Sequence, residues 1–207
     1  MAYFPFFMEI SSREGLIVGG GTVALRKIEK LLPYGVHLTV AAPEFLPEIE
    51  EIHGLTLLRQ PYSRDLLENR FFVIAATDDL GLNHMISVQC QELRVPVNVV
   101  DDRSLCTFLF PALVKRGELS IGISTGGASP SAAIYLKEQI QSVLPENFDT
   151  LLSYLDSLRI EIKKSLPDER QRAEFFRCLC ARCLRDGWPL SNAALQNELR
   201  KFTEGDI

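Results

Sequence analysis

The stretch that decides the fold is LIVGGGTVA, residues 16–24. A short apolar run is followed by three glycines, and apolar residues at helical spacing continue to residue 32. The stretch fits the pattern G-x-G-x-x-A, in which Gly19 permits a tight turn, Gly21 lets the backbone approach a pyrophosphate and Ala24 allows close packing of helix on sheet. A helix N-terminus at this point favours a negative group. The strand–turn–helix context predicts a dinucleotide site, the alternative being a glycine-rich turn without a ligand.

The pattern around this stretch alternates between strands and helices. Helices are predicted over 22–32, 45–52 and 82–93. Strands are predicted over 16–18, 36–41, 55–58, 71–76 and 95–100. The run 71–76 is apolar throughout, which is typical of a strand buried on both faces. Alternating strands and helices predict an α/β fold with an N-terminal Rossmann, doubly wound parallel sheet.

The pattern changes after residue 102. Two β runs, 107–114 and 119–125, predict an antiparallel hairpin with a four-residue turn. A helix then begins at Pro130 with Ser129 as its N-cap. Helices are expected over 148–165, 168–186 and 191–202. We therefore predict an NAD(P)-binding domain over 1–112, a small α+β dimerisation region over 113–147 and a C-terminal helical domain over 148–207. A lone hairpin is too small a sheet to be stable, which predicts pairing with a second copy in a homodimer.

Composition narrows the class of partner. The 207 residues carry a formal net charge of −5, which argues against a nucleic-acid-binding protein. Residues 1–112 account for this excess, while residues 113–207 are neutral. The longest apolar runs have about six residues, against the ~18–20 that a membrane span needs. The apolar N-terminus lacks the basic region of a signal peptide, so we expect a cytoplasmic protein and no membrane partner.

The cysteines and histidines do not predict a metal site. Cys178, Cys180 and Cys183 fall on a predicted helix, where Cys178 lies about 160° around from Cys180 by the 3.6-residue period, so the three cannot hold one ion without unwinding. We interpret them as buried or half-buried free thiols. The remaining candidate ligands are far apart along the chain and are interpreted as structural or solvent-facing: His37, His53 and His84.

Polar residues at strand ends are candidates for the site, because ligands of doubly wound sheets lie outside the carboxyl ends of the strands. Thr77 follows the fourth strand and is expected near the cofactor. Pro43 and Glu44 follow the second strand and are expected to border the adenosine half. Glu44 lies late for a ribose-binding acid, and no arginine marks a 2′-phosphate site, so NAD and NADP both stay open. The acids at 78 and 79 are interpreted as helix caps.

Asp101 follows the fifth predicted strand. A carboxylate there would lie near the nicotinamide, where a general acid or base is useful. Strand-end acids are also frequent turn formers, which is the competing interpretation. Strand alternation predicts that Asp102 points the other way.

The blocks together resemble a known family. They comprise residues 16–27, with three glycines and the pair Arg26-Lys27, AATDD at 75–79, NVVD at 98–101, Pro111 and STGGASP at 124–130. Their order and spacing are similar to those of precorrin-2 dehydrogenases, which include the dehydrogenase/ferrochelatase module of siroheme synthases. The resemblance covers residues 1 to about 145 strongly, and the helical tail is similar only in length and kind.

The resemblance implies an activity, a cofactor and site residues. The family oxidises precorrin-2 to sirohydrochlorin with NAD, and many members then insert Fe²⁺ as a substrate to give siroheme. Its members are intertwined homodimers with an N-terminal Rossmann domain. The family's essential acid falls on Asp101, and its cofactor contacts fall on the glycine turn, Thr22, Val23, Pro43 and Glu44. With 207 residues, the chain is expected to lack the methyltransferase domain of the larger members.

The resemblance to this family implies a role for the motif STGGASP at 124–130. Precorrin-2 carries eight carboxylates and needs anion sites, which a glycine-rich loop leading into a helix supplies. The candidate substrate-binding residues are Ser124, Thr125, Gly126 and Gly127. A simple loop and helix cap is the competing interpretation. The alternative function from another class is a non-catalytic NAD(P)-sensing module, and the sequence does not separate a dehydrogenase from a bifunctional dehydrogenase and chelatase.

Overall fold

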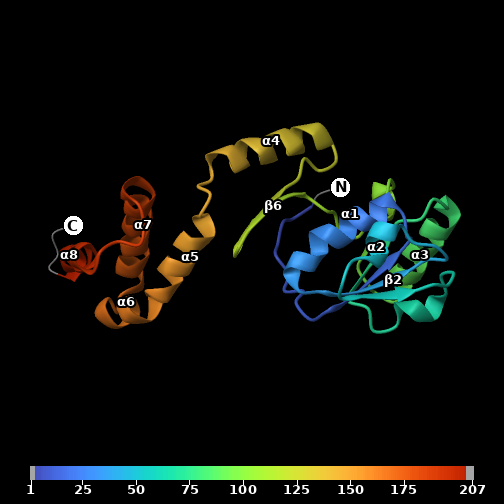
Figure 1. The fold of residues 1–207 in the computed structure, drawn as a ribbon, viewed down its shortest axis with the longest axis horizontal. Coiled ribbons are helices and arrows are strands. Elements are labelled where there is room, and N and C mark those ends of the chain that lie inside the picture. The colour runs from blue at the N-terminus through green and yellow to red at the C-terminus, as the bar shows by residue number, and fades with distance from the viewer. Residues whose placement is uncertain (1–2, 204–207) are drawn as a thin grey trace. The chain divides into compact units, whose positions relative to one another are not determined.

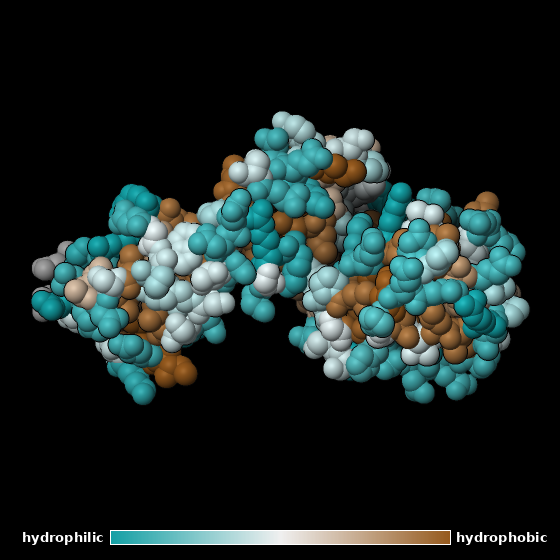
Figure 2. All heavy atoms as spheres, viewed as in Figure 1, coloured by the Kyte–Doolittle hydropathy of each residue, from teal (hydrophilic) through white to brown (hydrophobic). Residues whose placement is uncertain are grey.

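The structure, a computed structural model, describes residues 3–203 and divides into two compact units, Met1–Pro111 and Ala112–Ile207 (Figure 1). On the visible face of each unit, hydrophobic patches are interspersed among hydrophilic and intermediate residues (Figure 2). Within residues 3–203, no helix has the length and apolar character that crossing a membrane requires. The division of the second unit at residue 148 stays a prediction.

The first unit is built on a five-stranded sheet in the order β3-β2-β1-β4-β5. All four strand pairs are parallel, and β1 lies at the centre, with Ile17 aligned to Val40 on one side and Ile74 on the other. The strands take the first five positions of the doubly wound order 3-2-1-4-5-6. A doubly wound parallel sheet is the fold that the sequence predicted. The strands are β1 (Glu14–Val18), β2 (His37–Ala41), β3 (Leu55–Leu58), β4 (Phe72–Ala75) and β5 (Val97–Val99).

Helices cover both faces of this sheet. One face packs against α1 (Thr22–Leu31) and the short α2 (Pro47–Glu50), through Ile28 and Ile49 among others. The other face packs against α3 (Leu80–Glu92) and the 3₁₀ turn η2 (Arg64–Leu67), which forms the β3–β4 crossover. The sequence predicted a longer α2 and a later start of α3, and it did not predict η2. Two further 3₁₀ turns are η1 (Leu32–Tyr34) and η3 (Arg103–Leu105).

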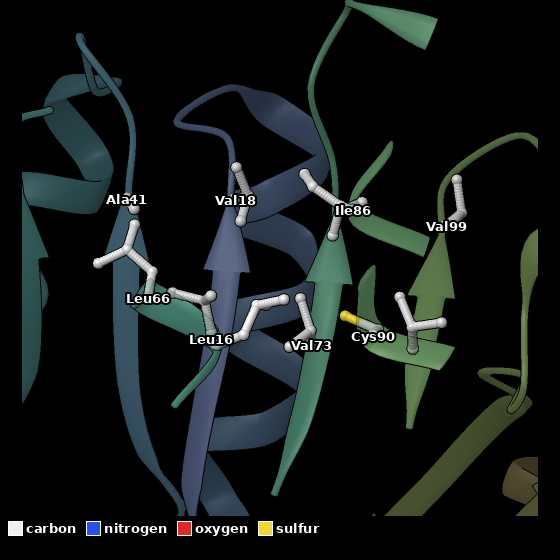
Figure 3. Close-up of a cluster of buried hydrophobic side chains, with 11 residues drawn as sticks. Leu16, Val18, Ala41, Leu66, Val73, Ile86, Cys90 and Val99 are labelled. Carbon is white, nitrogen blue, oxygen red and sulfur yellow. The ribbon is translucent and has the colours of Figure 1, made fainter. Parts of the chain in front are cut away.

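The central strands are buried on both sides. Leu16 and Val18 of β1 point to the α3 face, as Figure 3 shows, where they lie with Val73 of β4 and with Ile86 of α3. Ile17, between them, points to the α1 face and is fully buried. Every residue of β4 is buried. The uninterrupted apolar runs of the sequence therefore reflect strands that are buried on both faces, as predicted.

The outer edge of β5 is closed by a loop and not by another strand. The amide of Thr107 donates to the Val97 carbonyl at 2.8 Å, and the Val97 amide donates to Thr107 Oγ1 at 2.7 Å. The amide of Val99 donates to Cys106 Sγ at 3.1 Å. The predicted strand over 107–114 is therefore wrong in its first half: side chains in this segment serve the edge of β5, and strand pairing begins at Ala112.

The second unit begins with an antiparallel hairpin of β6 (Ala112–Arg116) and β7 (Leu119–Ile123). Arg116 pairs with Leu119, so the turn has two residues and not the predicted four, and Gly117 adopts a φ of 51° in it. The helix α4 (Pro130–Val143) packs on the hairpin and begins at the predicted cap, where Ser129 Oγ accepts from the Ala132 amide.

Four helices complete the second unit: α5 (Phe148–Ser157), α6 (Arg159–Ser165), α7 (Glu169–Asp186) and α8 (Asn192–Thr203). The predicted helix over 148–165 is divided in two at Leu158. Phe175 and Leu179 of α7 are fully buried in the core of these helices. Cys183 is buried in this core and Cys178 and Cys180 pack against it half-buried, all as free thiols, which is the burial predicted for them.

The cap of α3 gives a test of the local structure. Asp79 accepts from the amides of Gly81 and Leu82 at 2.9 and 3.0 Å, whereas Asp78 is an exposed neighbour outside the cap position. Asp79→Ala should lower the free energy of unfolding by about 1 kcal/mol, because two helix amides lose their acceptor. Urea denaturation measures this, with Asp78→Ala as the matched control. An equal loss in both variants would contradict the assignment of the cap to Asp79.

Candidate functional site

A pocket opens at the carboxyl ends of β1, β2 and β4. Its volume is about 530 Å³, and its lining includes five of the residues predicted from sequence: Gly19, Gly21, Pro43, Glu44 and Thr77. These residues come from three separate loops that the parallel sheet brings to one edge. The pocket lies beside the point where the strand order reverses, between β1 and β4, which is where doubly wound sheets bind ligands.

The glycine turn is required by backbone packing at two of its three positions. Gly19 has a φ of 125°, and a Cβ there would collide with the carbonyl oxygen of Ala76 at the end of β4. A Cβ on Gly20 would collide with the carbonyl oxygen of Glu44. No role was predicted for Gly20, although a third glycine at a free position of the pattern was the available signal. The turn is therefore wedged between the β4 end and the loop after β2.

Gly21 differs from its two neighbours. A Cβ built on it would meet no atom within 4 Å among the described residues. Protein packing therefore does not demand a glycine here, and the space beside the backbone is free for a ligand. This is the arrangement predicted for the position at which the chain approaches a pyrophosphate.

The N-terminus of α1 is suited to an anion. Gly21 is its N-cap, and within the described chain no side chain caps this helix and no acid lies in its first turn. By contrast, Asp79, Ser129 and Asp168 cap α3, α4 and α7. The first-turn amides and the positive end of the helix dipole face the pocket edge formed by the turn, a suitable place for a phosphate group. The residues present thus fit a dinucleotide.

Two predicted contacts, Thr22 and Val23, begin α1 directly after the turn. Thr22 is exposed, whereas Val23 is partly buried against the α1-side core of the sheet. The side chain of Val23 therefore serves packing. A contact with a ligand at these two positions would go through the backbone or through the Thr22 hydroxyl.

Thr77 owes its position to a buried asparagine. Asn83 is 2% exposed; its Oδ1 accepts from Thr77 Oγ1 at 2.8 Å, and its Nδ2 donates to the Thr77 carbonyl at 2.8 Å. The amide of Asp79 also donates to Thr77 Oγ1, at 3.3 Å. Thr77 therefore shapes the loop over the pocket as well as lining it. Sequence reasoning missed Asn83, because a polar residue within a predicted helix gives no sign of burial.

The loop after β2 forms the opposite wall. β2 ends at Ala41, and the Leu46 amide donates to the Gly20 carbonyl at 2.9 Å, which ties this loop to the glycine turn. Glu44 is exposed at the pocket rim, three residues beyond the strand. Tyr62 lines the same pocket and donates to Gln89 Oε1 at 2.7 Å, and burial raises the pKa of its hydroxyl to about 12. The loop after β2 thus brings the Glu44 side chain to the rim of the pocket.

Asp101 lies outside this pocket lining, in the turn that follows β5. β5 ends at Val99, and Asp101 is exposed with a φ of 62°, a left-handed conformation that is uncommon for residues other than glycine. The predicted strand through residue 100 is therefore too long, and the argument from strand alternation for Asp102 is wrong. Asp102 instead caps η3: the Ser104 amide and hydroxyl donate to its Oδ1, and these bonds lower the pKa of the Asp102 carboxyl.

The loop from Ser124 to Gly127 belongs to the second unit. Gly126 and Gly127 have φ values of 63° and 85°, and the Gly126 amide donates to Ser124 Oγ at 3.2 Å. Thr125 Oγ1 donates to the Ser129 carbonyl at 3.0 Å and accepts from the Ser129 amide at 3.1 Å. The loop geometry is therefore held by Thr125 and by the two glycines. Its role in binding a substrate stays a prediction.

The wedged glycine turn, the uncapped helix and the pocket at the reversal of strand order define a dinucleotide-binding α/β domain. The chain belongs to the family described as "Putative NAD(P)-binding", whose model matches residues 6–112. The cofactor class is thus NAD(P).

Known proteins match most of the chain. The chain is 36% identical over 179 residues to the siroheme synthases of Psychrobacter sp. (strain PRwf-1) and Thioalkalivibrio sulfidiphilus, and each match covers 85% of this chain. The chain spans little more than a third, 37%, of the length of these relatives. A solved structure, SirC, a precorrin-2 dehydrogenase, matches 98% of this chain and 100% of its own, with a TM-score of 0.73 and 28% identity. The predicted family resemblance and fold class are confirmed.

The glycine turn gives a test of cofactor binding. Gly21→Asp should leave the fold intact, because its Cβ enters open space, and should abolish NAD(P) binding, because a carboxylate then lies where a phosphate must bind. Isothermal titration calorimetry with NAD and NADP measures the affinity.

Gly20→Ala is the contrasting variant at the adjacent position. It should lower the free energy of unfolding by roughly 1–3 kcal/mol, because the Glu44 carbonyl and its loop have to move. Undiminished affinity in Gly21→Asp, or a stable Gly20→Ala, would contradict this account of the turn.

Proposed function

We propose that this chain is an NAD-dependent precorrin-2 dehydrogenase, which oxidises precorrin-2 to sirohydrochlorin in siroheme biosynthesis. The observation that carries the proposal is the whole-chain match to a solved precorrin-2 dehydrogenase. The siroheme synthases among its relatives support the same pathway. A sensor module would explain the pocket alone, but not the match through residues 112–207.

The reaction assigns distinct tasks to the two ligands and to the chain. Precorrin-2 loses a hydride and a proton, and NAD, when bound, accepts the hydride and becomes NADH. The glycine turn and the N-terminus of α1 bind the pyrophosphate. The loop 124–127 binds carboxylates of the tetrapyrrole, as its glycines and hydroxyls allow. Asp101, an exposed carboxylate beyond β5, accepts the proton.

Glu44 favours NAD over NADP. Its carboxylate lies exposed at the rim of the pocket, beside the wall formed by the loop after β2. A carboxylate there can accept hydrogen bonds from ribose hydroxyls and repels a 2′-phosphate. We therefore take NAD as the cofactor within the NAD(P) class.

Ferrous iron insertion extends the proposal as a second step in the same protein. The names of the relatives, siroheme synthases, support it. Inserting Fe²⁺ into sirohydrochlorin releases two pyrrole protons, which the exposed Asp101 carboxylate accepts one after the other and passes to solvent. Fe²⁺ is here a substrate and needs no resident metal site. The expected cytoplasmic location remains part of the proposal.

The test of the proposed role is Asp101→Asn. Asparagine is isosteric and tolerates the left-handed backbone at this position, so the fold and NAD affinity should be unchanged. The rate of NADH formation with anaerobic precorrin-2 should fall by about 10²–10⁴-fold, because a general base is lost.

Asp102→Asn is the matched control for this variant. An asparagine keeps the oxygen that accepts from Ser104, so η3 keeps its cap and turnover should stay near that of the wild type. If turnover survives Asp101→Asn and is lost in Asp102→Asn, the proton acceptor is Asp102 and not Asp101. Wild-type protein that binds NAD and forms no NADH would favour the sensor.

We further propose that the chain forms a homodimer. Among the described residues, the β6–β7 hairpin pairs with no third strand, and a two-stranded sheet is marginal in water. The neighbouring helix α4 exposes apolar side chains, with Ile134 at 52% and Tyr135 at 60%. Hydrophobic residues are visible among hydrophilic ones in this region in Figure 2. A second copy would cover both the strand edges and this helix face.

Light scattering after size-exclusion chromatography tests the assembly. The wild type should elute with twice the chain mass of 23.3 kDa, and Ile134→Glu should shift it toward the monomer by placing charge in the interface. A wild-type monomer at micromolar concentration would contradict the dimer.

A further inference from the structure

The loop that carries Asp101 is closed at both ends by one cysteine. Cys106 Sγ lies 3.2 Å from the Val99 carbonyl and 3.3 Å from the Asp102 carbonyl, and accepts from the Val99 amide at 3.1 Å. The segment after Cys106 then runs along the edge of β5 through Thr107. Residues 100–105 thus form a short loop with fixed ends, and Asp101 lies in it with left-handed backbone.

A lysine from another element contacts the segment before this loop and the segment after it. Lys27 Nζ, on α1, donates to Asn98 Oδ1 at 3.3 Å and lies 3.9 Å from the centroid of the Phe110 ring. Asn98 is 5% exposed, and its Nδ2 donates to the Phe108 carbonyl at 3.0 Å. Lys27 therefore connects the strand that leads into the Asp101 loop with the segment that leads out of it.

The environment of Lys27 is unusual for an ammonium group. Burial is the main cause that lowers the pKa of Lys27 to about 8, and the positive charge of Lys30, three residues along α1, lowers it further. Cys106 and Asp101, from the segment after β5, act in the opposite direction and favour the charged form. The titratable groups that influence the Lys27 pKa thus come from its own helix and from the segment after β5.

We propose that Lys27 is a positioning residue for Asp101, which holds the loop 100–105 in its working geometry through its contacts with Asn98 and Phe110. The inference rests on the proposed dehydrogenase function and deepens it. Lys27 does not line the nucleotide pocket, so its effect is on turnover and not on cofactor affinity. In the sequence, Lys27 is evident only as part of the matching block 16–27.

The inference has a consequence for pH dependence. Lys27 is charged below its pKa of about 8 and becomes neutral as the pH rises through that value. The neutral amine keeps its hydrogen bond to Asn98, but it loses the attraction to Asp101 and to the Phe110 ring. Turnover should therefore fall on the alkaline side, with a one-proton midpoint near the Lys27 pKa.

The experiment is a profile of kcat against pH for the wild type, Lys27→Met and Lys30→Met. Lys27→Met should lower kcat by about 10- to 100-fold, because the acid is no longer held in place, and should remove the alkaline limb. Its NAD affinity should stay at the wild-type value. Lys30→Met is the matched control on the same helix; it should keep kcat and move the alkaline midpoint upward, because it removes the charge that lowers the Lys27 pKa.

A second readout does not depend on activity. Lysines are methylated with ¹³C-formaldehyde, and the Lys27 resonance is assigned by its loss in Lys27→Met. Its midpoint should lie near 8 in the wild type and lower in Asp101→Asn, because the acid that favours the charged form is gone. This measurement succeeds or fails whether or not the protein oxidises precorrin-2.

The outcomes separate the two proposals. A wild type without NADH formation overturns the proposed function, and the ¹³C titration then still decides whether Lys27 and Asp101 are coupled. An alkaline limb that persists in Lys27→Met overturns the inference while the function stands. A Lys27→Met variant that loses NAD affinity as strongly as kcat assigns Lys27 to the fold alone and also overturns it.

Discussion

The contact between the glycine turn and the backbone of its neighbours is the constraint on which the site depends. Gly19 passes so close to the Ala76 carbonyl, and Gly20 so close to the Glu44 carbonyl, that neither position has room for a Cβ. These contacts fix the end of β1 against the end of β4 and the loop after β2. The same contacts aim the N-terminus of α1 at the pocket and leave open space beside Gly21. Backbone packing thus requires Gly19 and Gly20, while the proposed pyrophosphate contact falls on Gly21.

A second constraint governs the edge of the first unit at which Asp101 lies. β5 is an edge strand, and its outer hydrogen-bonding groups are met by Thr107 and Cys106 instead of a sixth strand. Covering an edge in this way prevents pairing with other chains. It also brings the chain back along β5 and so creates the loop in which Asp101 lies. The position of the proposed proton acceptor is therefore a by-product of how the sheet ends.

Much of the first unit could be predicted from the sequence, because its signals are local. The apolar runs of β1 and β4, the periodicity of α1 and the glycine turn all follow from neighbouring residues. Gly20, Asn83 and Lys27 could not be predicted in this way, because their roles depend on contacts with Glu44, Thr77 and Asn98. The strand through residue 100 was predicted too long because Val100 continues the valine-rich run by composition, whereas the backbone turns after Val99.

The proposed activity joins hydride transfer to NAD with the oxidation of a tetrapyrrole in one protein. It can be measured by anaerobic incubation of the purified wild type with precorrin-2 and NAD, followed by absorption spectra of both products. One NADH should appear for each sirohydrochlorin formed. NAD binding without NADH formation, or sirohydrochlorin formed at the same rate when NAD is omitted, would contradict it.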